Sequence, residues 1–415
     1  MEFKAFNLNP GLEAGIAAAG YVTPTPIQTK AIPYVTKGRD IIGLAQTGTG
    51  KTAAFALPIL NRLMQGKRGG VRSLIITPTR ELAEQIHDTI NCLGNKTRIR
   101  SVSIYGGVNI NTQIKKLNQG AEIVVACPGR LLDHVNRGTI KLNRVEVLVI
   151  DEADHMFDMG FLPDIRRILK HLPAQRQTLL FSATMPNEIH GLAKDILNDP
   201  ITIKIGETAP ADTVSHAHYP VAQHLKTAFL LKLLGNINSK SVLVFTRTKH
   251  RAKHLDEQLI KAGISSTSLQ GNLSQGRRQA ALDGFRKGTF QVLVATDIAA
   301  RGIDVCKISH VINYDIPDTP DAYIHRIGRT GRAEQNGDAF TLITSDDKQM
   351  VNAIDRVIGS KVECRTLADF DYNTPAPQKA NKGRSVPSSL RTRHKIGNKR
   401  HVSPTFAKKN KSNYI

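Results

Sequence analysis

The residues whose types and spacing best suit chemistry form the glycine-rich segment 45–52, with the sequence AQTGTGKT. It follows a short apolar run, 40–44, and precedes an apolar stretch with helical character, 53–60. A buried strand, a glycine-rich turn and a helix start together form the setting of a phosphate-binding loop. Gly48 and Gly50 would let the backbone curl so that successive N–H groups point at one anion. The helix N-terminus adds a partial positive charge at the same place.

Two side chains at the end of this segment complete a predicted nucleotide site. Lys51 would reach the β- and γ-phosphates as a point charge, and Thr52 would place its hydroxyl on Mg²⁺. The strict pattern begins with Gly, whereas this chain has Ala45. The residues predicted to surround the phosphates are Ala45, Gln46, Thr47, Gly48, Thr49, Gly50, Lys51 and Thr52.

A pair of acids follows the apolar run 145–150, whose sequence is VEVLVI. Ligands of parallel sheets bind beyond the carboxyl ends of the strands, so a buried strand here would bring Asp151 and Glu152 beside the phosphate loop. Asp151 is suited to hold Mg²⁺ through water. Glu152 is suited to orient or deprotonate an attacking water. We therefore predict that both acids and Lys51 are catalytic, and that Asp151 is a metal ligand together with Thr52.

Gln28 follows the proline-rich sequence TPTPI at residues 23–27 and is expected in a rigid turn near the loop. A glutamine amide has a donor and an acceptor side by side. This pair matches the N6 donor and N7 acceptor of adenine, whereas guanine offers two acceptors. Gln28 is therefore predicted to select ATP over GTP, which makes ATP and Mg²⁺ the expected cofactors.

Apolar strand-like runs alternate with helical stretches on both sides of residues 206–215, which have Gly, Pro and small polar residues without periodicity. This alternation predicts an α/β fold with a parallel sheet and helices on both its faces, in each of two tandem domains. The expected organisation is a first domain at 1–205, a short flexible linker at 206–215, and a second domain at 216–370. Strands are expected at 40–44, 73–77, 122–126, 145–150, 178–181 and 201–205, and then at 241–245, 266–269, 291–295, 310–313 and 339–344. Clear helical stretches are expected at 80–93, 161–172, 250–262 and 279–287.

The second domain has no phosphate loop but carries a run of arginines. Arg326, Arg329 and Arg332 lie three residues apart, on roughly one face of a helix or turn. They could stabilise the charge of a transferring phosphoryl group, as arginine fingers do. They could equally bind the phosphates of a nucleic acid. The residues alone weight these two roles equally.

The charge of the chain indicates a polyanionic partner. The net charge is +22, and residues 376–415 contain eleven Lys and Arg with no Asp or Glu. A basic body with a more basic tail most simply suggests a nucleic acid. Residues 371–415 are low in apolar side chains, which predicts a disordered tail that binds nucleic acid by counterion release. There is no apolar run of 18 or more residues, so no membrane-spanning helix is expected.

As a set, these motifs resemble those of the DEAD-box RNA helicases of helicase superfamily 2, over residues 1 to about 370. The run DEADHMFDMGFLPDIRRIL at 151–169 is most similar to the short, bacterial RhlE-like branch. The resemblance implies two RecA-like domains and an ATP-dependent RNA helicase that unwinds short duplexes locally or remodels ribonucleoprotein. It also implies a protein, monomeric by default, that binds RNA with little sequence preference. The cysteines, at 92, 127, 306 and 364, lie far apart without C-x-x-C spacing, which is typical of reduced thiols in a cytoplasmic protein, and no membrane association is expected. Partners in ribosome assembly or RNA decay are family expectations among which the sequence does not choose.

The resemblance assigns further roles to matching positions. Phe3 is similar to the aromatic residue that stacks on adenine, and Asp304 to the residue that holds the ribose. His325 resembles the coupling histidine, and Arg329 and Arg332 resemble the arginine fingers. Ser182, Ala183 and Thr184 match the motif that couples hydrolysis to RNA separation. The RNA-facing positions are Pro78, Thr79, Arg80, Gly106, Gly107, Pro128, Gly129, Arg130, Thr246, Arg247, Gln275, Arg278, Thr296 and Arg301.

One departure from the family concerns a predicted RNA contact. The family usually has Thr-Pro-Gly-Arg where this chain has Cys127 followed by Pro128, Gly129 and Arg130. A thiol is a poorer hydrogen-bond donor than a hydroxyl, so a phosphate contact there is expected to be weaker.

Two other functions stay open at this point. One is a DNA-acting superfamily 2 translocase, which the glutamine and the DEAD sequence disfavour. The other is an ATP-gated RNA clamp without productive unwinding, which the complete set of motif acids and arginines disfavours.

Overall fold

The computed structural model describes residues 2–46, 48–205, 214–237, 241–300, 308–331 and 336–376. Most of the predicted linker and all but the first six residues of the predicted tail lie outside these ranges. Residues 1–374 group into one compact unit. No helix of the described residues is long and apolar enough to cross a membrane.

The first domain is built on a seven-stranded sheet in which every neighbouring pair is parallel. Its strands, in spatial order, are β3 (Ser101–Ile104), β4 (Ile123–Ala126), β2 (Ser73–Ile76), β5 (Val147–Ile150), β6 (Gln177–Ser182), β1 (Ile41–Ala45) and β7 (Ile201–Ile205). The helices are α1 (Pro10–Ala18), α2 (Pro26–Thr36), α3 (Lys51–Leu63), α4 (Arg80–Leu93), α5 (Ile110–Asn118), α6 (Pro128–Asn136), α7 (Ala153–Asp158), α8 (Leu162–Leu169) and α9 (Asn187–Ile196). A 3₁₀ helix, η1 (Phe3–Phe6), precedes them.

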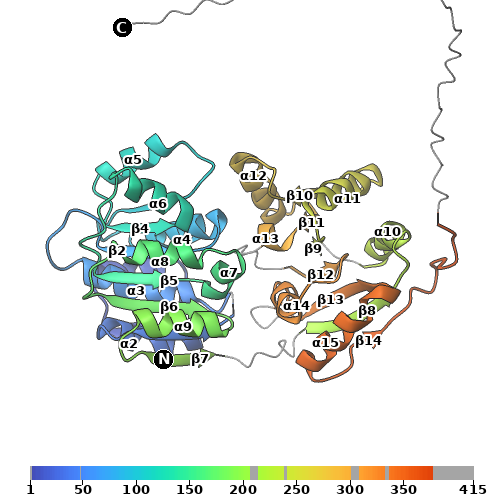
Figure 1. Ribbon diagram of the computed structural model, residues 1–415, viewed down its shortest axis with the longest axis horizontal. Coiled ribbons are helices and arrows are strands. Elements are labelled where there is room, and N and C mark those ends of the chain that lie inside the picture. Colours follow the sequence, from blue (N-terminus) through green and yellow to red (C-terminus); the bar gives the residue numbers. More distant parts are fainter. Residues whose placement is uncertain are drawn as a thin grey trace, which may run out of the picture. The chain divides into compact units, whose positions relative to one another are not determined.

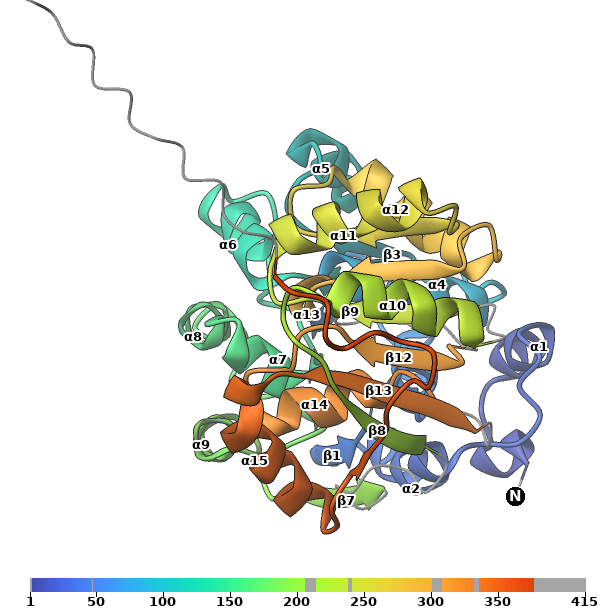
Figure 2. The ribbon, with the colours of Figure 1, turned by 90° about the vertical axis from the view of Figure 1, so that its right-hand side faces the viewer.

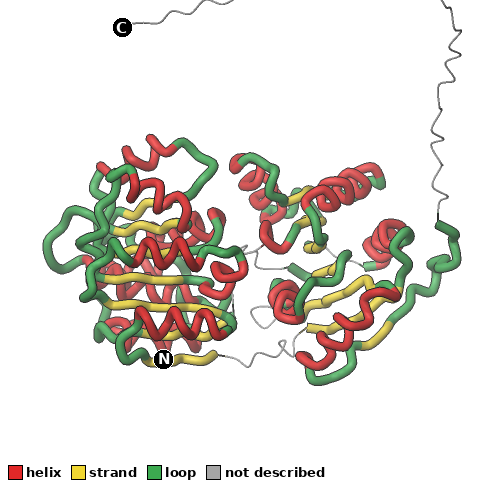
Figure 3. Tube along the Cα trace, in the orientation of Figure 1, coloured by secondary structure: helices red, strands yellow, loops and turns green. Residues whose placement is uncertain are grey.

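Alternate residues of the central strands supply the cores on the two faces of this sheet. Val147 and Val149 pack in the cluster that α1–α4 cover, while Leu148 and Ile150 pack in the cluster that α6–α9 cover. Because both faces are buried, the strand is a continuous apolar run without a polar face. Figure 3 shows the helices of this domain on both sides of its strands.

The second domain repeats this architecture with a second seven-stranded parallel sheet. Its strands, in spatial order, are β10 (Ser266–Leu269), β11 (Val292–Ala295), β9 (Val242–Phe245), β12 (His310–Asn313), β13 (Gly337–Ile343), β8 (Val214–Pro220) and β14 (Glu363–Cys364), and Figure 2 shows β13 between β12 and β8. The helices are α10 (Lys226–Asn236), α11 (Lys249–Lys261), α12 (Gln275–Arg286), α13 (Asp297–Ala300), α14 (Pro320–Ile327) and α15 (Lys348–Ile358), with a 3₁₀ helix η2 (Ser345–Asp347).

The structure adds three strands to those expected from the sequence, namely β3, β8 and β14. Since β8 begins at Val214, the last two residues of the expected linker belong to the second domain. The helix expected at 80–93 is observed with those bounds, whereas α12 begins four residues earlier than expected.

His218 is expected to make the stability of the second domain depend on pH. It lies on β8, is fully buried, and neither ring nitrogen has a hydrogen-bond partner among the described residues. Burial lowers its pKa, which the charge of Asp355 only partly opposes. The unfolded chain therefore binds a proton more readily, so stability falls as pH falls through about 6.5, the value for an unfolded histidine, towards the lower folded pKa.

We expect His218→Leu to reduce this loss of stability between neutral pH and pH 5.5. The reduction should be at most about 1.4 kcal/mol per pH unit, the value for one proton. Denaturant unfolding at several pH values measures it, with the exposed His254→Leu on α11 as the control. An unchanged pH dependence in His218→Leu contradicts the assignment.

Candidate functional site

The glycine-rich segment joins β1 to α3, as the strand–turn–helix pattern predicts. Gly48 and Gly50 have φ of 86° and 90°, in the left-handed region that favours glycine. A Cβ on Gly50 would lie 2.5 Å from Nε2 of Gln28. Both glycines are therefore needed for the path of this turn. Thr47 lies outside the described residues.

Lys51 begins α3 and is buried, although it carries a charge. Its Nζ donates to the carbonyl oxygen of Ala45 at 2.7 Å. Ala45 is buried at the end of β1, so the methyl group that departs from the strict loop pattern packs in the core. Thr49 Oγ1 donates to the carbonyl oxygen of Gln46 at 2.8 Å, which closes the turn.

Gln28 lies in the first turn of α2, so the rigid turn expected there is instead a helix start. Its Oε1 accepts from the N–H of Thr25 at 2.9 Å, and its Nε2 donates to the carbonyl oxygen of Gly50 at 3.1 Å. The amide is thus fixed against the glycine-rich loop. Because an amide has two donors and two lone pairs, one of each remains for a base.

Phe3 is buried in η1, where its ring contacts two other aromatic rings. It stacks on Tyr21 at a centroid distance of 6.1 Å and meets Phe6 edge-on at 5.9 Å. These contacts make Phe3 part of the core of the first domain.

Asp151 and Glu152 directly follow β5 and are both buried. Glu152 has a φ of 54°, which is uncommon for a residue with a side chain and costs of order 1–3 kcal/mol. Its Oε2 lies 3.0 Å from Nδ1 of His155, while its Oε1 is buried without a partner among the described residues. An unpaired carboxylate oxygen is costly unless a ligand or water completes it. This oxygen therefore fits a site for an attacking water.

The two acids have different proton affinities. Burial raises the pKa of Asp151 to about 6, against the charge of Lys51. Burial also acts to raise the pKa of Glu152, but His155, Lys51 and Arg329 outweigh it and hold this pKa below its usual value. Glu152 is therefore a carboxylate at neutral pH, able to accept a proton. A cation beside Asp151 would favour its charged form, so the donor set fits Mg²⁺.

Asp154 connects this acidic segment to the end of β6, a role that the residues alone did not indicate. Its Oδ2 accepts from the N–H groups of Ala183 and Thr184 at 3.1 and 2.9 Å, and from Thr184 Oγ1 at 3.2 Å. Ser182 Oγ in turn accepts from the N–H of Asp154 at 3.1 Å. Burial acts to raise the pKa of Asp154, but the charges of His155 and His325, together with the bond from the N–H of Thr184, hold it below its usual value.

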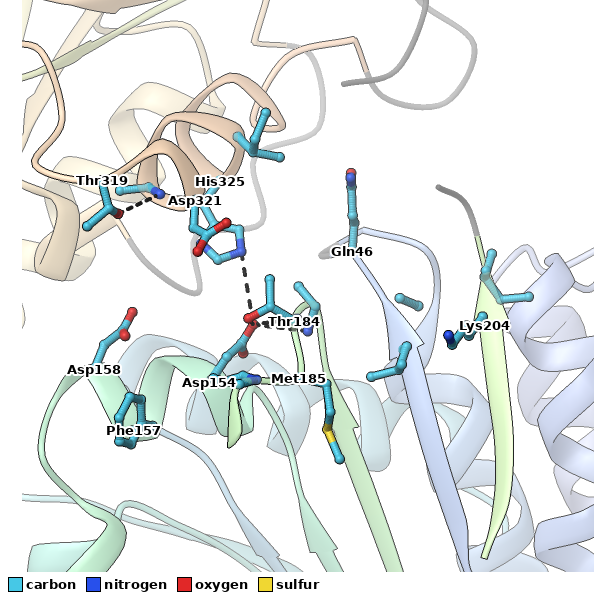
Figure 4. Close-up of a pocket in the computed structure, with 17 residues that line it drawn as sticks. Gln46, Asp154, Phe157, Asp158, Thr184, Met185, Lys204, Thr319, Asp321 and His325 are labelled. Carbon is cyan, nitrogen blue, oxygen red and sulfur yellow. Dashed lines mark hydrogen bonds and ion pairs between the residues drawn. The ribbon is translucent and has the colours of Figure 1, made fainter. Parts of the chain in front are cut away.

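His325 on α14 extends this network from the second domain, as Figure 4 shows. Its Nε2 lies 4.0 Å from Asp154 Oδ2, and its Nδ1 lies 3.4 Å from Nε2 of His155. A cavity of about 600 Å³ adjoins the network, lined among others by Gln46, Thr184 and His325. The structure therefore brings together the predicted coupling residues of both domains.

The three arginines predicted on one face have different surroundings. Arg326 is buried and donates from Nε and Nη2 to the two carboxylate oxygens of Asp297, at 2.5 and 2.7 Å. It therefore serves the fold of the second domain. Arg329 follows the end of α14 and is also buried, and its charge lowers the pKa of Glu152. Arg332 lies outside the described residues, as do Arg301 and Asp304.

Several residues predicted to face RNA lie at the carboxyl ends of the strands of the first domain. Thr79 caps α4 by accepting from the N–H of Leu82 at 3.3 Å, next to Pro78. Arg80 lies against the loop after β3, because a Cβ on Gly107 would be 2.1 Å from its Nη1. A Cβ on Gly106 would be 3.6 Å from the same guanidinium.

Cys127 is the N-cap of α6, whose first residues are Pro128, Gly129 and Arg130. The thiol is buried in the core, and burial raises its pKa to about 12. The substitution for Thr thus places a neutral sulfur inside the domain and provides no side-chain cap. Arg130 is held by the carbonyl oxygen of Val108 at 3.0 Å.

In the second domain, the predicted RNA-facing residues lie at the ends of β9 and β11 and on α12. Thr246 is fully buried, while Arg247 is half-exposed and pairs with Asp318 at 3.2 Å. Arg278 donates from Nε to Glu81 of the first domain at 2.6 Å, with both side chains buried. Gln275 begins α12 with a buried Oε1 that has no partner among the described residues, and Thr296 is partly exposed beyond β11.

Two family models match this chain. The model of the DEAD/DEAH box helicase matches residues 25–192, and that of the helicase conserved C-terminal domain matches residues 225–334. The first match holds the glycine-rich loop and the acids, and the second holds α12 and α14. They correspond to the two sheets of the structure.

Named relatives and solved structures agree with these matches. The chain is 41% identical over 362 residues to the DEAD-box ATP-dependent RNA helicase CshA of Geobacillus kaustophilus, covering 87% of this chain and 77% of the relative. It is 44% identical over 372 residues to the DEAD-box ATP-dependent RNA helicase RhpA of Helicobacter pylori, covering 89% and 75%. The structure of S. cerevisiae Dbp5 bound to RNA and ADP BeF3 is similar with a TM-score of 0.80 and 32% identity, covering 88% of this chain and 95% of that one. This likeness confirms the predicted fold of two tandem RecA-like domains.

Proposed function

Because this chain belongs to the DEAD/DEAH box helicase family, we propose that it is an ATP-dependent RNA helicase that separates short RNA duplexes locally. The observation that carries the proposal is the cluster of Lys51, Asp151 and Glu152, in which one oxygen of Glu152 is buried without a partner among the described residues. The names of the bacterial relatives, and the RNA and ADP BeF3 bound to yeast Dbp5, support it.

Each residue of the cluster has a distinct proposed task. The substrate is ATP with Mg²⁺, and the ion supplies charge neutralisation at the β- and γ-phosphates. Lys51 and the N–H groups of the glycine-rich loop hold the phosphates, and Asp151 and Thr52 face the ion. Glu152 accepts the proton of the attacking water.

The second domain completes this site in the proposed mechanism. Arg329 stabilises the charge that develops on the transferring phosphoryl group, which the buried position of its guanidinium near Glu152 supports. Arg332 and Asp304 are assigned to the phosphates and the ribose by resemblance alone, as Phe3 is to adenine. The assignment of Gln28 to adenine is also supported by the donor and the lone pair that its amide keeps free beside the glycine-rich loop. Asp154, bonded to Thr184 and close to His325, links the state of the acids to the contact between the domains.

RNA contacts of the core are proposed at the carboxyl ends of both sheets, mainly to phosphates and 2′-hydroxyls. Gly107→Ala tests one of them. The added Cβ would clash with Arg80 Nη1, and the φ of 83° at this position adds strain. We expect RNA affinity to fall about tenfold, which is roughly the 1.4 kcal/mol of one charged contact.

Gly191→Ala on α9 is the control for this variant, because it lies outside the predicted RNA contacts and its added Cβ would meet no atom of the described residues within 4 Å. Anisotropy titrations of both variants with a short single-stranded RNA measure the difference. Equal affinities for the two variants would contradict the proposed role of Arg80.

Several finer points belong to the proposal. We infer an RhlE-like ancestry from the resemblance of residues 151–169. We also infer a cytoplasmic protein from the spacing of its cysteines, with a monomeric core as the default. Partners in ribosome assembly or RNA decay are consistent with it.

Strand separation tests the proposed function directly. With ATP, the full chain should separate a short RNA duplex, whereas ADP should give no separation and an equivalent DNA duplex should stay paired. Separation of the DNA duplex at the same rate would favour the translocase. ATP-dependent RNA binding without any separation would favour the clamp.

A further inference from the structure

The first domain has a second charged surface at the amino ends of its strands, away from the nucleotide site. Its four segments, 65–72, 94–100, 115–122 and 137–146, precede β2, β3, β4 and β5. In Figure 1 these loops lie at the left-hand end of the sheet, whereas α7, which follows β5, lies at its right-hand end. We call the four segments the amino-edge surface.

Backbone hydrogen bonds place these segments side by side. The backbone N–H of Glu122 donates to the carbonyl oxygen of Arg100 at 2.9 Å. The backbone N–H of Arg72 donates to the carbonyl oxygen of Glu122 at 2.8 Å. The backbone N–H of Glu146 donates to the carbonyl oxygen of Arg72 at 2.7 Å. The charges of four separate loops are therefore brought onto one edge of the sheet.

The amino-edge surface holds most of the excess positive charge of the folded domains. The chain has 57 Lys and Arg and 35 Asp and Glu. Eleven of the basic residues lie in 376–415, so residues 1–375 have 46 basic and 35 acidic residues, a net charge of +11. The four segments have eleven basic and two acidic residues, a net charge of +9. All other residues up to 375 together carry only +2.

The two acids of this surface are both bound from inside by one buried arginine. Arg72 is buried, and it donates to Glu146 at 2.6 Å and to Glu122 at 3.3 Å. Among the described residues, only Arg68 of the remaining basic side chains is in an ion pair, with Glu122 at 3.7 Å. Ten basic side chains are exposed: Lys67, Arg68, Lys96, Arg98, Arg100, Lys115, Lys116, Arg137, Lys141 and Arg144.

Three of the exposed arginines are ordered by backbone carbonyl groups of neighbouring segments. Arg68 donates to the carbonyl oxygens of Thr97 and Arg98 at 3.1 Å each. Arg144 donates to Gly69 at 2.7 Å, and Arg100 donates to Gln119. These bonds use one or two of the five donors of a guanidinium. They leave the charges of Arg100 and Arg144 without an acidic partner among the described residues.

Such a surface fits a polyanion better than solvent or a lipid surface. Exposed faces of soluble proteins usually intersperse both signs of charge. This one has ten exposed cations and a single partly exposed acid, Glu146, which pairs with Arg72. Binding in a lipid interface also needs apolar side chains that enter it. The large exposed apolar residues of the described chain, which are Tyr21, Val22, Tyr34, Ile260 and Val357, all lie elsewhere.

We propose that the amino-edge surface binds the phosphate backbone of RNA, at a site distinct from the contacts at the carboxyl ends of the strands. The first domain thereby holds one segment of a structured RNA while the nucleotide-dependent site acts on another. This inference rests on the proposed function, which makes RNA the polyanion present. Contacts to phosphates carry no sequence information, so the surface would bind RNA of any sequence.

The test neutralises one exposed lysine in each segment, as Lys67→Gln, Lys96→Gln, Lys116→Gln and Lys141→Gln combined in the full chain. None of these side chains makes a hydrogen bond or ion pair with the described residues, so the fold is not at risk. Binding of a long hairpin RNA is titrated at several salt concentrations. The slope of log K against log salt should flatten by roughly 0.9 for each phosphate of the hairpin duplex that the variant no longer neutralises, or about 3.6 for four phosphates.

Activity supplies a second readout. The RNA-stimulated kcat of the quadruple variant should stay unchanged. The concentration of a short single-stranded RNA that gives half-maximal stimulation should also stay unchanged. The concentration of the long hairpin that gives half-maximal stimulation should rise. The control carries Lys232→Gln, Lys261→Gln, Lys287→Gln and Lys361→Gln, four exposed lysines of the second domain. An equal change of slope in the control would show that the effect comes from the net charge of the chain and not from the amino-edge surface, which would overturn the inference.

The outcomes separate this inference from the proposed function. Stimulation of the unaltered chain by RNA, with an unchanged salt slope in the quadruple variant, contradicts the amino-edge surface alone. If the quadruple variant loses binding to anionic lipid vesicles that the unaltered chain binds, while its RNA binding stays unchanged, the ligand of the amino-edge surface is a membrane and the inference is overturned. Absence of RNA stimulation in the unaltered chain contradicts the proposed function itself.

Discussion

Glu152→Gln is expected to lower the kcat of RNA-stimulated ATP hydrolysis by about 10²- to 10⁴-fold, the usual contribution of a positioned general base. The amide has the shape of the carboxylate but cannot take a proton from water. Glu152 is buried, ionised through the charges of His155, Lys51 and Arg329, and has one oxygen without a partner among the described residues. Steady-state ATPase assays at saturating RNA measure the effect.

Binding measurements distinguish loss of chemistry from loss of the site. The Glu152→Gln variant should retain affinity for ATP and for RNA, because Lys51 and the RNA-facing residues are unchanged. The exposed Glu188→Gln on α9 is the control and should hydrolyse ATP at the normal rate. Normal turnover in Glu152→Gln would show that another group accepts the proton.

Arg329→Lys is expected to lower kcat by about 10³- to 10⁵-fold, the range for removal of an arginine finger. Lysine keeps the charge but lacks the planar fork of donors that fits a phosphoryl group. The buried Arg329 side chain is close enough to Glu152 to lower its pKa, which supports a place at the reacting phosphate. ATPase assays and RNA titrations of the same preparation measure both possible roles.

The comparison with Arg326→Lys makes this prediction specific. Arg326 is held by both oxygens of Asp297, so its replacement should lower the melting temperature. Arg329→Lys should lower kcat without that change. If Arg329→Lys instead weakened RNA binding and left kcat at saturating RNA intact, the arginine would be an RNA contact.

Strands that are continuous apolar runs were predictable, whereas β3 and β8, which contain buried or half-buried polar side chains, were missed. The runs at 147–150 and 242–245 are continuously apolar because each face of their sheet is covered by helices. The sequence SVSI of β3 lacks this apolar pattern. Ser103 can be buried there because its hydroxyl donates a hydrogen bond to Glu84 at 2.6 Å. Likewise, β8 contains His216, which bonds Tyr323 at 3.2 Å. Such partners come from the tertiary fold and have no local signal.

The same distinction holds for the candidate site. The glycine-rich loop and the acids after β5 could be predicted because each motif is contiguous in the sequence. Asp154 could not, because the N–H of Thr184 that it binds lies 30 residues away. The ion pair of Arg278 with Glu81 spans 197 residues of sequence and could not be predicted for the same reason. Gln28 was correctly expected near the glycine-rich loop. Its place in a helix rather than a turn depends on its bonds to Thr25 and Gly50.

The measurement that tests the central claim most directly is the steady-state ATPase rate of the full chain at fixed salt. It is made without nucleic acid, with RNA and with single-stranded DNA. We expect RNA alone to stimulate hydrolysis strongly, because in the proposed mechanism the two domains contribute different parts of one active site. Equal stimulation by RNA and DNA, or none by either, would contradict an RNA-dependent ATPase.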